Sequence, residues 1–288
     1  MRITQSMLSN NMLRNLSNSY AKLDTYMNQV STGKKINRPS DDPVIAMKGI
    51  NYRSQVSEVD QYLRNTNEVH NWMDNSDAAL DKATQTMQKL RELAVQASNG
   101  TYDEEERENI KKEAEQLKEH LIDIANTQVN GKYIFNGTNT TEPPYADGNF
   151  TANLDKVSIE VAAGTKLQAN VNGEDVFGND LFANIDTFIN QLGEGDQAGI
   201  ESSIETLDGG INQIINARAD LGARMNRLEL VENRLSEQKI IATSTMAENE
   251  NVDYEEAITN LITQESLHRA ALSAGSRIIQ PSLVDFLQ

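Results

Sequence analysis

Residues 59–97 have the sequence VDQYLRNTNEVHNWMDNSDAALDKATQTMQKLRELAVQA, and this stretch decides the fold. Mostly apolar positions recur in it at spacings that alternate between three and four residues, which is typical of a helix that packs along one continuous seam. Such a helix spans roughly 58 Å at 1.5 Å per residue, so the stretch predicts a long rod. The seam positions are Val59, Tyr62, Thr66, Val69, Met73, Ser76, Leu80, Ala83, Met87, Leu90, Ala94 and Ala97.

A second seam with the same spacing precedes the rod. It comprises Leu13, Leu16, Tyr20, Leu23, Met27 and Val30. An isolated helix of about twenty residues is marginal in water, so this stripe needs a partner helix. The partner can come from this chain or from another chain. Gly33 ends the helix, and Asp42 followed by Pro43 suits the N-cap and first position of the rod helix.

Helical patterns return after the rod. Thr101 with Glu104 predicts a capping box for a third helix, and a stripe from Ile200 to Leu235 predicts another long helix. Asp253 with Glu256 predicts the cap of a last helix, after which the tail is unusually apolar. The last helix carries Ile258, Leu261, Ile262, Leu272 and Ile279, and the tail carries Leu283, Val284, Phe286 and Leu287.

The composition changes between these helical regions. Residues 131–182 are rich in Gly, Asn, Thr and Asp, and the alternating runs 157–161 and 167–171 on either side of Ala163-Gly164 predict short strands. We therefore expect a mainly α fold, an elongated bundle of long helices with paired N- and C-terminal coiled-coil helices and a small inserted β domain. The expected regions are terminal helices over 1–42 and 248–288, a helical rod over 43–130 and 184–247, and a β-rich insert over 131–183.

The composition excludes several classes of function. The chain of 288 residues has 26 Lys and Arg against 43 Asp and Glu, and a net charge of −17 argues against general nucleic-acid binding. The longest apolar run is Val44–Met47, whereas a membrane span needs about 20 residues. The first residues open no hydrophobic block, so we expect no ordinary secretory signal peptide. Without cysteine, the chain has no disulfide, thiolate nucleophile or Cys-based zinc site.

Charge is distributed unevenly between the two ends. Residues 1–40 contain six basic residues and one acidic residue, a net charge of +5. Residues 241–288 contain two basic and seven acidic residues, a net charge of −5. The ends should therefore attract each other, although the same pattern also fits two separate solvated helix faces.

We find no pattern that predicts catalysis. His70, His120 and His268 fall on three different expected helices and lack the i, i+4 pairing of a metal-binding helix. The glycine-rich stretch 193–199 lacks the preceding strand and the Lys-Ser/Thr ending of a phosphate loop, so it predicts a helix break. We expect no catalytic residue, no metal site and no cofactor. The apolar stripes predict instead that copies pack side by side in a helical or tubular assembly.

Residues 31–43, STGKKINRPSDDP, resemble the flagellin superfamily, in which a Gly-Lys/Arg-Ile turn leads to an Asp-Asp pair before the first rod helix. The Pro-Ser-Asp-Asp-Pro form is more similar to the hook-associated protein 3 branch than to filament flagellins, as are residues 131–137, GKYIFNG, and Pro143-Pro144-Tyr145. Residues 280–287, QPSLVDFL, are similar to the family's Gln-x-Ser-Leu-Leu-Asp-Tyr-Leu pattern and depart from it at Val284 and Phe286.

The resemblance implies a structural protein at the hook–filament junction of the bacterial flagellum. Its implied partners are hook-associated protein 1 on the hook side, flagellin on the distal side, further copies of itself in a junction ring, and an export chaperone. It also implies export in unfolded form through the flagellar type III apparatus, without a cleaved signal peptide, to an extracellular site. The terminal helices would be disordered in the free monomer and would pair on assembly.

Two groups of residues are the expected assembly site. The interface group comprises Leu13, Leu16, Tyr20, Leu23, Met27, Val30, Ile258, Leu261, Leu272, Ile279, Leu283, Phe286 and Leu287. The turn motif comprises Gly33, Arg38, Asp41, Asp42 and Pro43, in which the two aspartates either cap the helix or contact a neighbouring subunit. Alternative hypotheses are a short filament flagellin, a coiled-coil adaptor that forms a closed oligomer, and an enzyme with its site in the β region.

Overall fold

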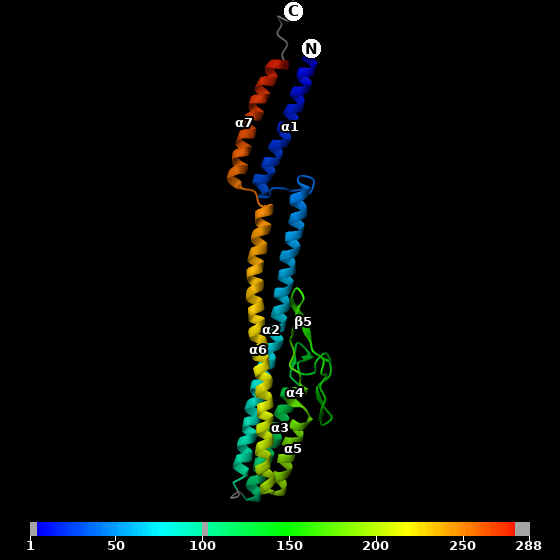
Figure 1. Cartoon of the computed structure of the whole chain (residues 1–288), viewed down its shortest axis with the longest axis vertical. Helices are drawn as coiled ribbons and strands as arrows, with labels where there is room; N and C mark the ends of the chain where they lie inside the picture. The colour runs from blue at the N-terminus through cyan, green and yellow to red at the C-terminus, as the bar shows by residue number, and fades with distance from the viewer. Residues whose placement is uncertain (1–4, 100–102, 280–288) are drawn as a thin grey trace, which may run out of the picture. The chain divides into compact units, whose positions relative to one another are not determined.

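The computed structural model describes residues 5–99 and 103–279, most of them in helices (Figure 1). The helices are α1 (Gln5–Thr32), α2 (Pro43–Ala97), α3 (Glu104–Ala125), α4 (Glu174–Phe177), α5 (Asn179–Glu194), α6 (Gln197–Glu250) and α7 (Tyr254–Ile279). The chain forms two compact units. The terminal unit comprises the residues up to 58 and those from 239 onward, and the middle unit comprises residues 59–238. In the described ranges, no helix is both long and apolar enough to cross a membrane.

Three two-stranded antiparallel hairpins lie between α3 and α4 in the sequence. The strands are β1 (Gln128–Val129), β2 (Lys132–Tyr133), β3 (Tyr145–Ala146), β4 (Asn149–Phe150), β5 (Ser158–Ala162) and β6 (Thr165–Gln168). Gly164 adopts a φ of +70° in the turn between β5 and β6, as expected for a glycine in a tight turn. The prediction of short strands around Ala163-Gly164 is therefore confirmed, although β6 ends three residues before Val171.

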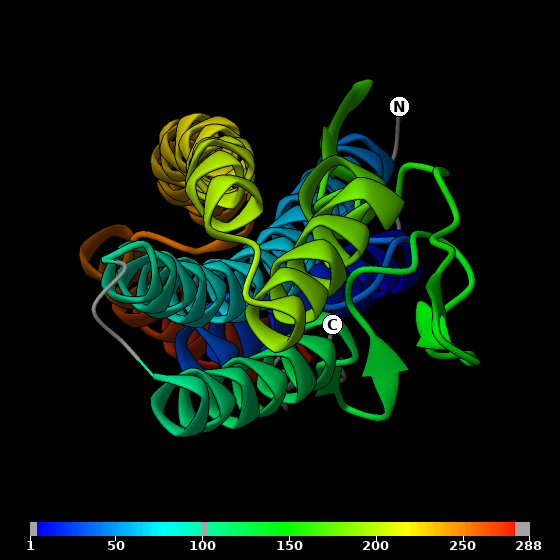
Figure 2. The same cartoon turned by 90° about the horizontal axis from the view of Figure 1, so that it is seen from below.

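The core of the middle unit lies along the predicted seam of the long helix. Every seam position of α2 from Thr66 to Ala97 is buried. The seam faces apolar residues of α6, of which Leu207, Ile214, Leu221 and Leu228 are fully buried. Seen end-on, α2, α3, α5 and α6 lie side by side with the β hairpins to one side of them (Figure 2). Burying one large apolar side chain contributes about 1.5–3 kcal/mol, so this seam contributes substantially to the stability of the middle unit.

The β hairpins share this core. Phe135, Phe150 and Phe177 are buried, and the ring centroids of Phe135 and Phe177 lie 5.1 Å apart in an edge-to-face arrangement. Tyr145 of β3 packs against Phe182 of α5 at a centroid distance of 4.8 Å. These aromatic contacts join the hairpins to α4 and α5 through one continuous apolar cluster.

Two helix starts test the capping predictions. The N-cap of α3 is Asp103, whose side chain accepts a hydrogen bond from the backbone N–H of Glu106, so the prediction of Thr101 with Glu104 was wrong by two residues. The sequence contains both boxes, and the Asp103 box is the one that forms. The prediction for α7 is confirmed, because Asp253 Oδ1 accepts hydrogen bonds from the N–H groups of Glu255 and Glu256.

Candidate assembly interface

Helices α1 and α7 of the terminal unit pair in antiparallel orientation. Near the start of α1, Met12 lies against Gly275, where a Cβ would come within 2.6 Å of Met12 Cε. Further along, Gln264 Nε2 donates to Ser19 Oγ at 2.8 Å. At the end of α1, the N–H of Val252 donates to the carbonyl of Gly33 at 2.9 Å. The pairing of N- and C-terminal helices is therefore confirmed.

The pairing covers only one side of the apolar stripe predicted on α1. The positions of α1 that are half-buried are Ser9, Met12, Leu16, Ser19, Leu23, Tyr26, Gln29 and Val30. Leu13, Tyr20 and Met27 stay outside this seam, with 54%, 65% and 57% of their surface exposed. These three residues recur every seven positions and therefore lie on one side of the helix, which we call the open flank.

The contact face of α7 consists mainly of small and polar residues. Its least exposed positions are Ala257, Asn260, Leu261, Gln264, His268, Ala271 and Gly275. Of the residues predicted on this helix, Leu261 is half-buried, whereas Ile258 and Leu272 remain 43% and 48% exposed. The side chain of Ile279 and the residues Leu283, Phe286 and Leu287 lie outside what the structure describes. A search for apolar residues misses most of this contact face, and the small residues at 257, 271 and 275 are the signal that could have found it.

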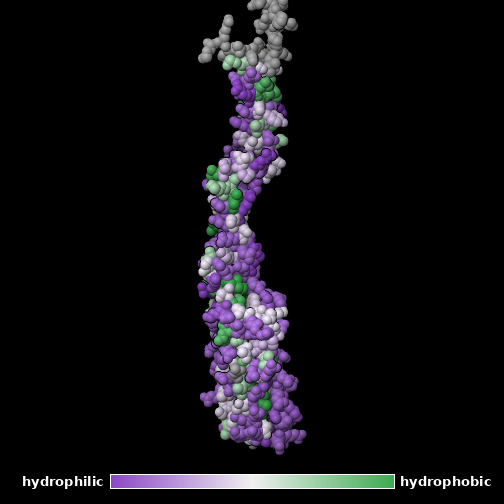
Figure 3. Space-filling view, turned by 90° about the vertical axis from the view of Figure 1, so that its right-hand side faces the viewer, coloured by the Kyte–Doolittle hydropathy of each residue, from purple (hydrophilic) through white to green (hydrophobic). Residues whose placement is uncertain are grey.

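The terminal unit has almost no core of its own. Among its described residues, Ala257 is the only apolar residue that is buried. Figure 3 shows hydrophobic residues at the surface among hydrophilic ones. Because burial of apolar surface is the dominant favourable term in folding, the α1–α7 pair has little to offset its ordering entropy in an isolated chain.

The turn motif connects the two ends of the chain. Gly33 adopts a φ of +71°, and its N–H donates to the carbonyl of Gln29 to close α1. Lys34 then pairs with Asn251 in an antiparallel bridge, and the N–H of Lys35 donates to the carbonyl of Glu250 at 2.8 Å. The turn therefore adds a two-residue piece of sheet between the end of α1 and the end of α6.

The two aspartates of the turn motif make local hydrogen bonds. Asp42 Oδ1 accepts from the N–H groups of Val44 and Ile45 at 2.9 and 3.1 Å, which caps α2 ahead of Pro43. Asp41 Oδ2 accepts from the N–H groups of Arg38 and Asn37, and these bonds lower the pKa of Asp41. In the described structure, Asp42 therefore caps α2 and Asp41 stabilises the turn before it. The guanidinium of Arg38 is exposed beside them.

A buried carboxylate joins the oppositely charged ends of the chain. The side chain of Glu250 is only 8% exposed and forms ion pairs with Arg53 Nε at 2.6 Å and Lys34 Nζ at 3.1 Å. The hydrogen bond from Arg53, helped by Lys34 and opposed by burial, lowers the pKa of Glu250. Lys34 and Glu250 belong to the basic and acidic ends, so the attraction expected from their charges occurs at this position.

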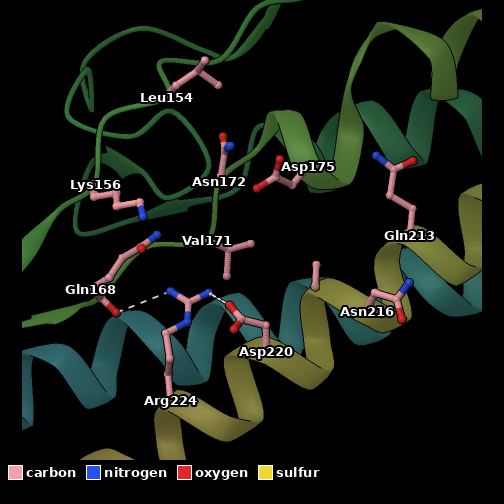
Figure 4. Close-up of a pocket in the computed structure, with 11 residues that line it drawn as sticks. Leu154, Lys156, Gln168, Val171, Asn172, Asp175, Gln213, Asn216, Asp220 and Arg224 are labelled. Carbon is pink, nitrogen blue, oxygen red and sulfur yellow. Dashed lines mark hydrogen bonds and ion pairs between the residues drawn. The ribbon is translucent and has the colours of Figure 1, made fainter.

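The middle unit contains a polar pocket of about 400 Å³ between the β hairpins and α6 (Figure 4). The guanidinium of Arg224 lies there, paired with Asp220 at 2.7 Å and donating to the carbonyl oxygens of Gln168 and Asn170. Figure 4 shows Arg224 reaching from α6 toward the hairpin residue Gln168, so this cluster fastens the hairpins to the helix. The residues that line the pocket include no Ser, Thr, Cys or His, so the lining offers no hydroxyl, thiol or imidazole group for nucleophilic catalysis.

Two models of protein families match the chain. One describes the bacterial flagellin N-terminal helical region and matches residues 3–140, and the other describes the bacterial flagellin C-terminal helical region and matches residues 204–287. The chain belongs to the flagellin family. It is therefore a structural component of the bacterial flagellum.

Individual members of the flagellin family match almost the whole chain. Flagellar hook-associated protein 3 of Escherichia coli K12 is 26% identical over 95% of this chain and 96% of its own length. Flagellin of Bacillus subtilis 168 is 27% identical over 94% of each chain. Among solved structures, the flagellar junction protein FlgL from Legionella pneumophila aligns with a TM-score of 0.60 at 16% identity, covering 71% of this chain and all of that one, which shows a shared fold.

Proposed function

We propose that this flagellin-family chain is a subunit of the hook–filament junction, where it joins hook-associated protein 1 to the flagellin filament. The observation that carries the proposal is the open flank of α1 in a terminal unit without a core of its own. Side-by-side packing with copies of the chain and with flagellar relatives would bury Leu13, Tyr20 and Met27. Since these side chains are 54–65% exposed, each such burial contributes about 1–2 kcal/mol, which is enough to offset part of the ordering entropy of the helices.

The same imbalance supports delayed folding of the chain ends. The middle unit has an extensive core, whereas the described part of the terminal unit buries one apolar residue. We therefore infer that α1 and α7 are disordered in the free monomer and become ordered when partners arrive. A chain of this kind suits export in unfolded form through the flagellar type III apparatus, and the absence of cysteine from its 288 residues prevents internal cross-links.

An export chaperone is the partner expected before assembly. Ile258, Ile262 and Leu272 of α7 are 43%, 58% and 48% exposed, and they would leave an apolar helix in contact with water. A chaperone that binds this helix would cover these residues until they reach the growing structure.

The junction role is favoured over a filament role by two features. The turn motif has the Pro-Ser-Asp-Asp-Pro form of the hook-associated branch, and hook-associated protein 3 aligns from end to end. The similarity to a filament flagellin at 27% identity keeps that role as a second candidate.

Electron microscopy of a strain that lacks this gene separates the two roles. A junction protein predicts hooks without filaments and flagellin monomers in the culture medium, because exported flagellin has nothing to attach to. A filament flagellin predicts hooks without filaments and no such monomers. Restoring the gene on a plasmid is the control, and normal filaments in the deletion strain would contradict both roles.

The open flank can be tested directly with charged substitutions. Leu13→Asp with Met27→Asp should abolish assembly, because two carboxylates would have to be buried between subunits, while α1 still faces α7 through Leu16 and Leu23. Asn15→Asp with Asn18→Asp is the matched control, because it adds the same charge at exposed positions on another side of α1. Motility and filaments are the measurements, and normal filaments in the first variant would refute the interface.

A further inference from the structure

A small cavity in the terminal unit lies beside the turn motif and has no role in the fold described above. Its volume is about 130 Å³, the space of about four water molecules at 30 Å³ each, which is enough for one large side chain. Ile36, Pro39, Ile45 and Ile50 give it an apolar lining. We call this cavity the turn pocket.

The surroundings of the turn pocket are both apolar and basic. Ile50 of α2 lines the cavity and is 63% exposed, so part of the apolar lining is open to water. Lys34, Arg38 and Arg53 also line it, against the single carboxylate of Glu250, which leaves a net charge of +2. The pocket therefore fits an apolar side chain that stands next to an acidic group.

One segment of this chain has that chemistry. Residues 283–287, Leu-Val-Asp-Phe-Leu, place one carboxylate, Asp285, among four apolar side chains. The segment lies outside the described residues. Phe286 is a suitable anchor because an aromatic ring fills a cavity of this size and Asp285 directly precedes it.

The segment cannot reach the turn pocket of its own chain. Helix α7 begins at Tyr254 beside Gly33, and Ile279 at its other end is about 38 Å away at 1.5 Å per residue. The contact of Gly275 with Met12 confirms that α7 extends away from the turn. From Ile279 to Phe286 a fully extended chain covers at most about 25 Å. The segment that fills the turn pocket must therefore come from a second molecule.

We propose that the turn pocket binds residues 283–287 of a second copy of this chain, with Phe286 in the cavity and Asp285 facing Arg38. Such a contact joins the tail of one copy to the turn of the next, so it is heterologous and extends an assembly instead of closing a dimer. The inference rests on the proposed function in so far as copies must meet in the flagellum.

A peptide-binding measurement tests the contact. The probe is a fluorescein-labelled peptide QPSLVDFLQ, residues 280–288. It is titrated with the full chain carrying Phe286→Asp, so that the chain's own tail does not compete, under conditions where hydrogen exchange in α7 shows that the α1–α7 pair has formed. Fluorescence anisotropy should show saturable binding with a dissociation constant below about 1 mM. Replacing Phe with Ala in the peptide should weaken binding at least tenfold. Absence of saturable binding, or equal binding of both peptides, would overturn the proposal.

A charge exchange identifies the site of binding. Arg38→Glu in the chain should lower its affinity for the native peptide at least fivefold. A peptide with Lys in place of Asp285 should bind the Arg38→Glu chain more tightly than the native peptide does. Lys112→Glu on α3 is the matched control, since it changes an exposed cation of the middle unit. Equal binding by the Arg38→Glu chain would place the peptide elsewhere and refute the turn pocket.

Failure of this contact is distinguishable from failure of the proposed function. If the peptide does not bind but the deletion strain lacks filaments and releases flagellin, the junction role stands and the turn pocket proposal is wrong. If the deletion strain has normal filaments, the junction role itself is wrong.

Discussion

Gly210 is a position where α6 approaches two neighbouring helices of the middle unit closely. A Cβ at this position would lie 2.5 Å from Leu181 Cδ1 and 3.0 Å from Met87 Cε, so α5 and α2 both pack onto the bare backbone. The preceding residue, Gly209, is exposed, and a Cβ there would meet nothing within 4 Å. Two adjacent glycines in one helix therefore have different reasons to be glycine.

Alanine at these two positions should change stability in opposite directions. Gly209→Ala should stabilise the middle unit by about 0.5–1 kcal/mol, because alanine loses less backbone entropy in a helix. Gly210→Ala gains the same backbone-entropy stabilisation but overpacks the core at a cost of about 1–3 kcal/mol. It should therefore destabilise the middle unit. Urea denaturation followed by circular dichroism measures both, and equal shifts of the two midpoints would contradict the packing argument.

Glu250 makes the terminal unit sensitive to acid. Arg53 and Lys34 hold the pKa of Glu250 below its ordinary value of 4.5, so the folded state binds its proton less readily than the unfolded state. The stabilisation is therefore complete above about pH 4.5 and is lost as the pH falls through the lower folded-state pKa. Glu250→Gln should lower the protection of the terminal unit's backbone amides from hydrogen exchange at pH 7. It should also reduce the loss of that protection as the pH falls.

Hydrogen exchange of the backbone amides around residues 33–35 and 250–252, under conditions where the α1–α7 pair forms, measures this effect between pH 7 and pH 3. Glu248→Gln is the control, because the side chain of Glu248 is exposed and only its backbone carbonyl binds Lys35. Parallel acid profiles for the wild-type chain and Glu250→Gln would show that the ion pairs do not stabilise the turn.

At the scale of the element, α1 carries two overlapping seams. Leu16, Leu23 and Val30 belong to the seam that faces α7, and the open flank lies next to it. A helix whose apolar face is wider than one partner can cover has room for a second partner. This arrangement separates the contacts that pair α1 with α7 from those available to other subunits.

Alanine substitutions separate the two seams. Leu23→Ala should weaken the α1–α7 pair by about 1 kcal/mol. This is half of the smallest cost, about 2 kcal/mol, of the same substitution at a fully buried leucine, because Leu23 is only half-buried. Met27→Ala should leave the pair unchanged, since the side chain of Met27 is 57% exposed. Hydrogen exchange in α7 under conditions where the pair forms is the measurement. A larger effect of Met27→Ala than of Leu23→Ala would reverse the assignment of the seams.

At the scale of the whole molecule, the two units differ in how much apolar surface they bury. The middle unit contains nearly all buried apolar residues of the described chain, from Val69 on α2 to Leu235 on α6. The terminal unit is held by one seam, one short bridge and one buried carboxylate. The units should therefore respond separately to protease and denaturant.

Limited proteolysis of the free chain should trim roughly the first 40 and the last 40 residues and leave a resistant fragment that contains residues 59–238. Phe177→Ala, which removes a fully buried ring at a cost of about 3–5 kcal/mol, should make that fragment susceptible as well. Mass spectrometry identifies the fragments. Resistant ends in the dilute chain would favour the closed coiled-coil adaptor over an assembly subunit.

The long helices, the start and end of α2 and the family were predictable from the sequence. The local signals are the seam spacing along residues 59–97, which alternates between three and four, the cap at Asp42 and the glycine at position 33. Such signals favour or end a helix regardless of its position in the fold. The misplaced cap at Thr101 shows the limit of such signals, because two capping boxes overlap within six residues and only one can start a helix.

The side of α1 that turns toward α7 depended on residues more than two hundred positions away. Gly275 lets Met12 approach closely, Gln264 binds Ser19, and the bridge between Lys34 and Asn251 sets the end of the pair. These contacts rotate α1 so that Leu13, Tyr20 and Met27 face away from its partner. Periodicity along one helix shows that an apolar face exists, but the rotation of that face is set by the shape and hydrogen bonds of the helix packed against it.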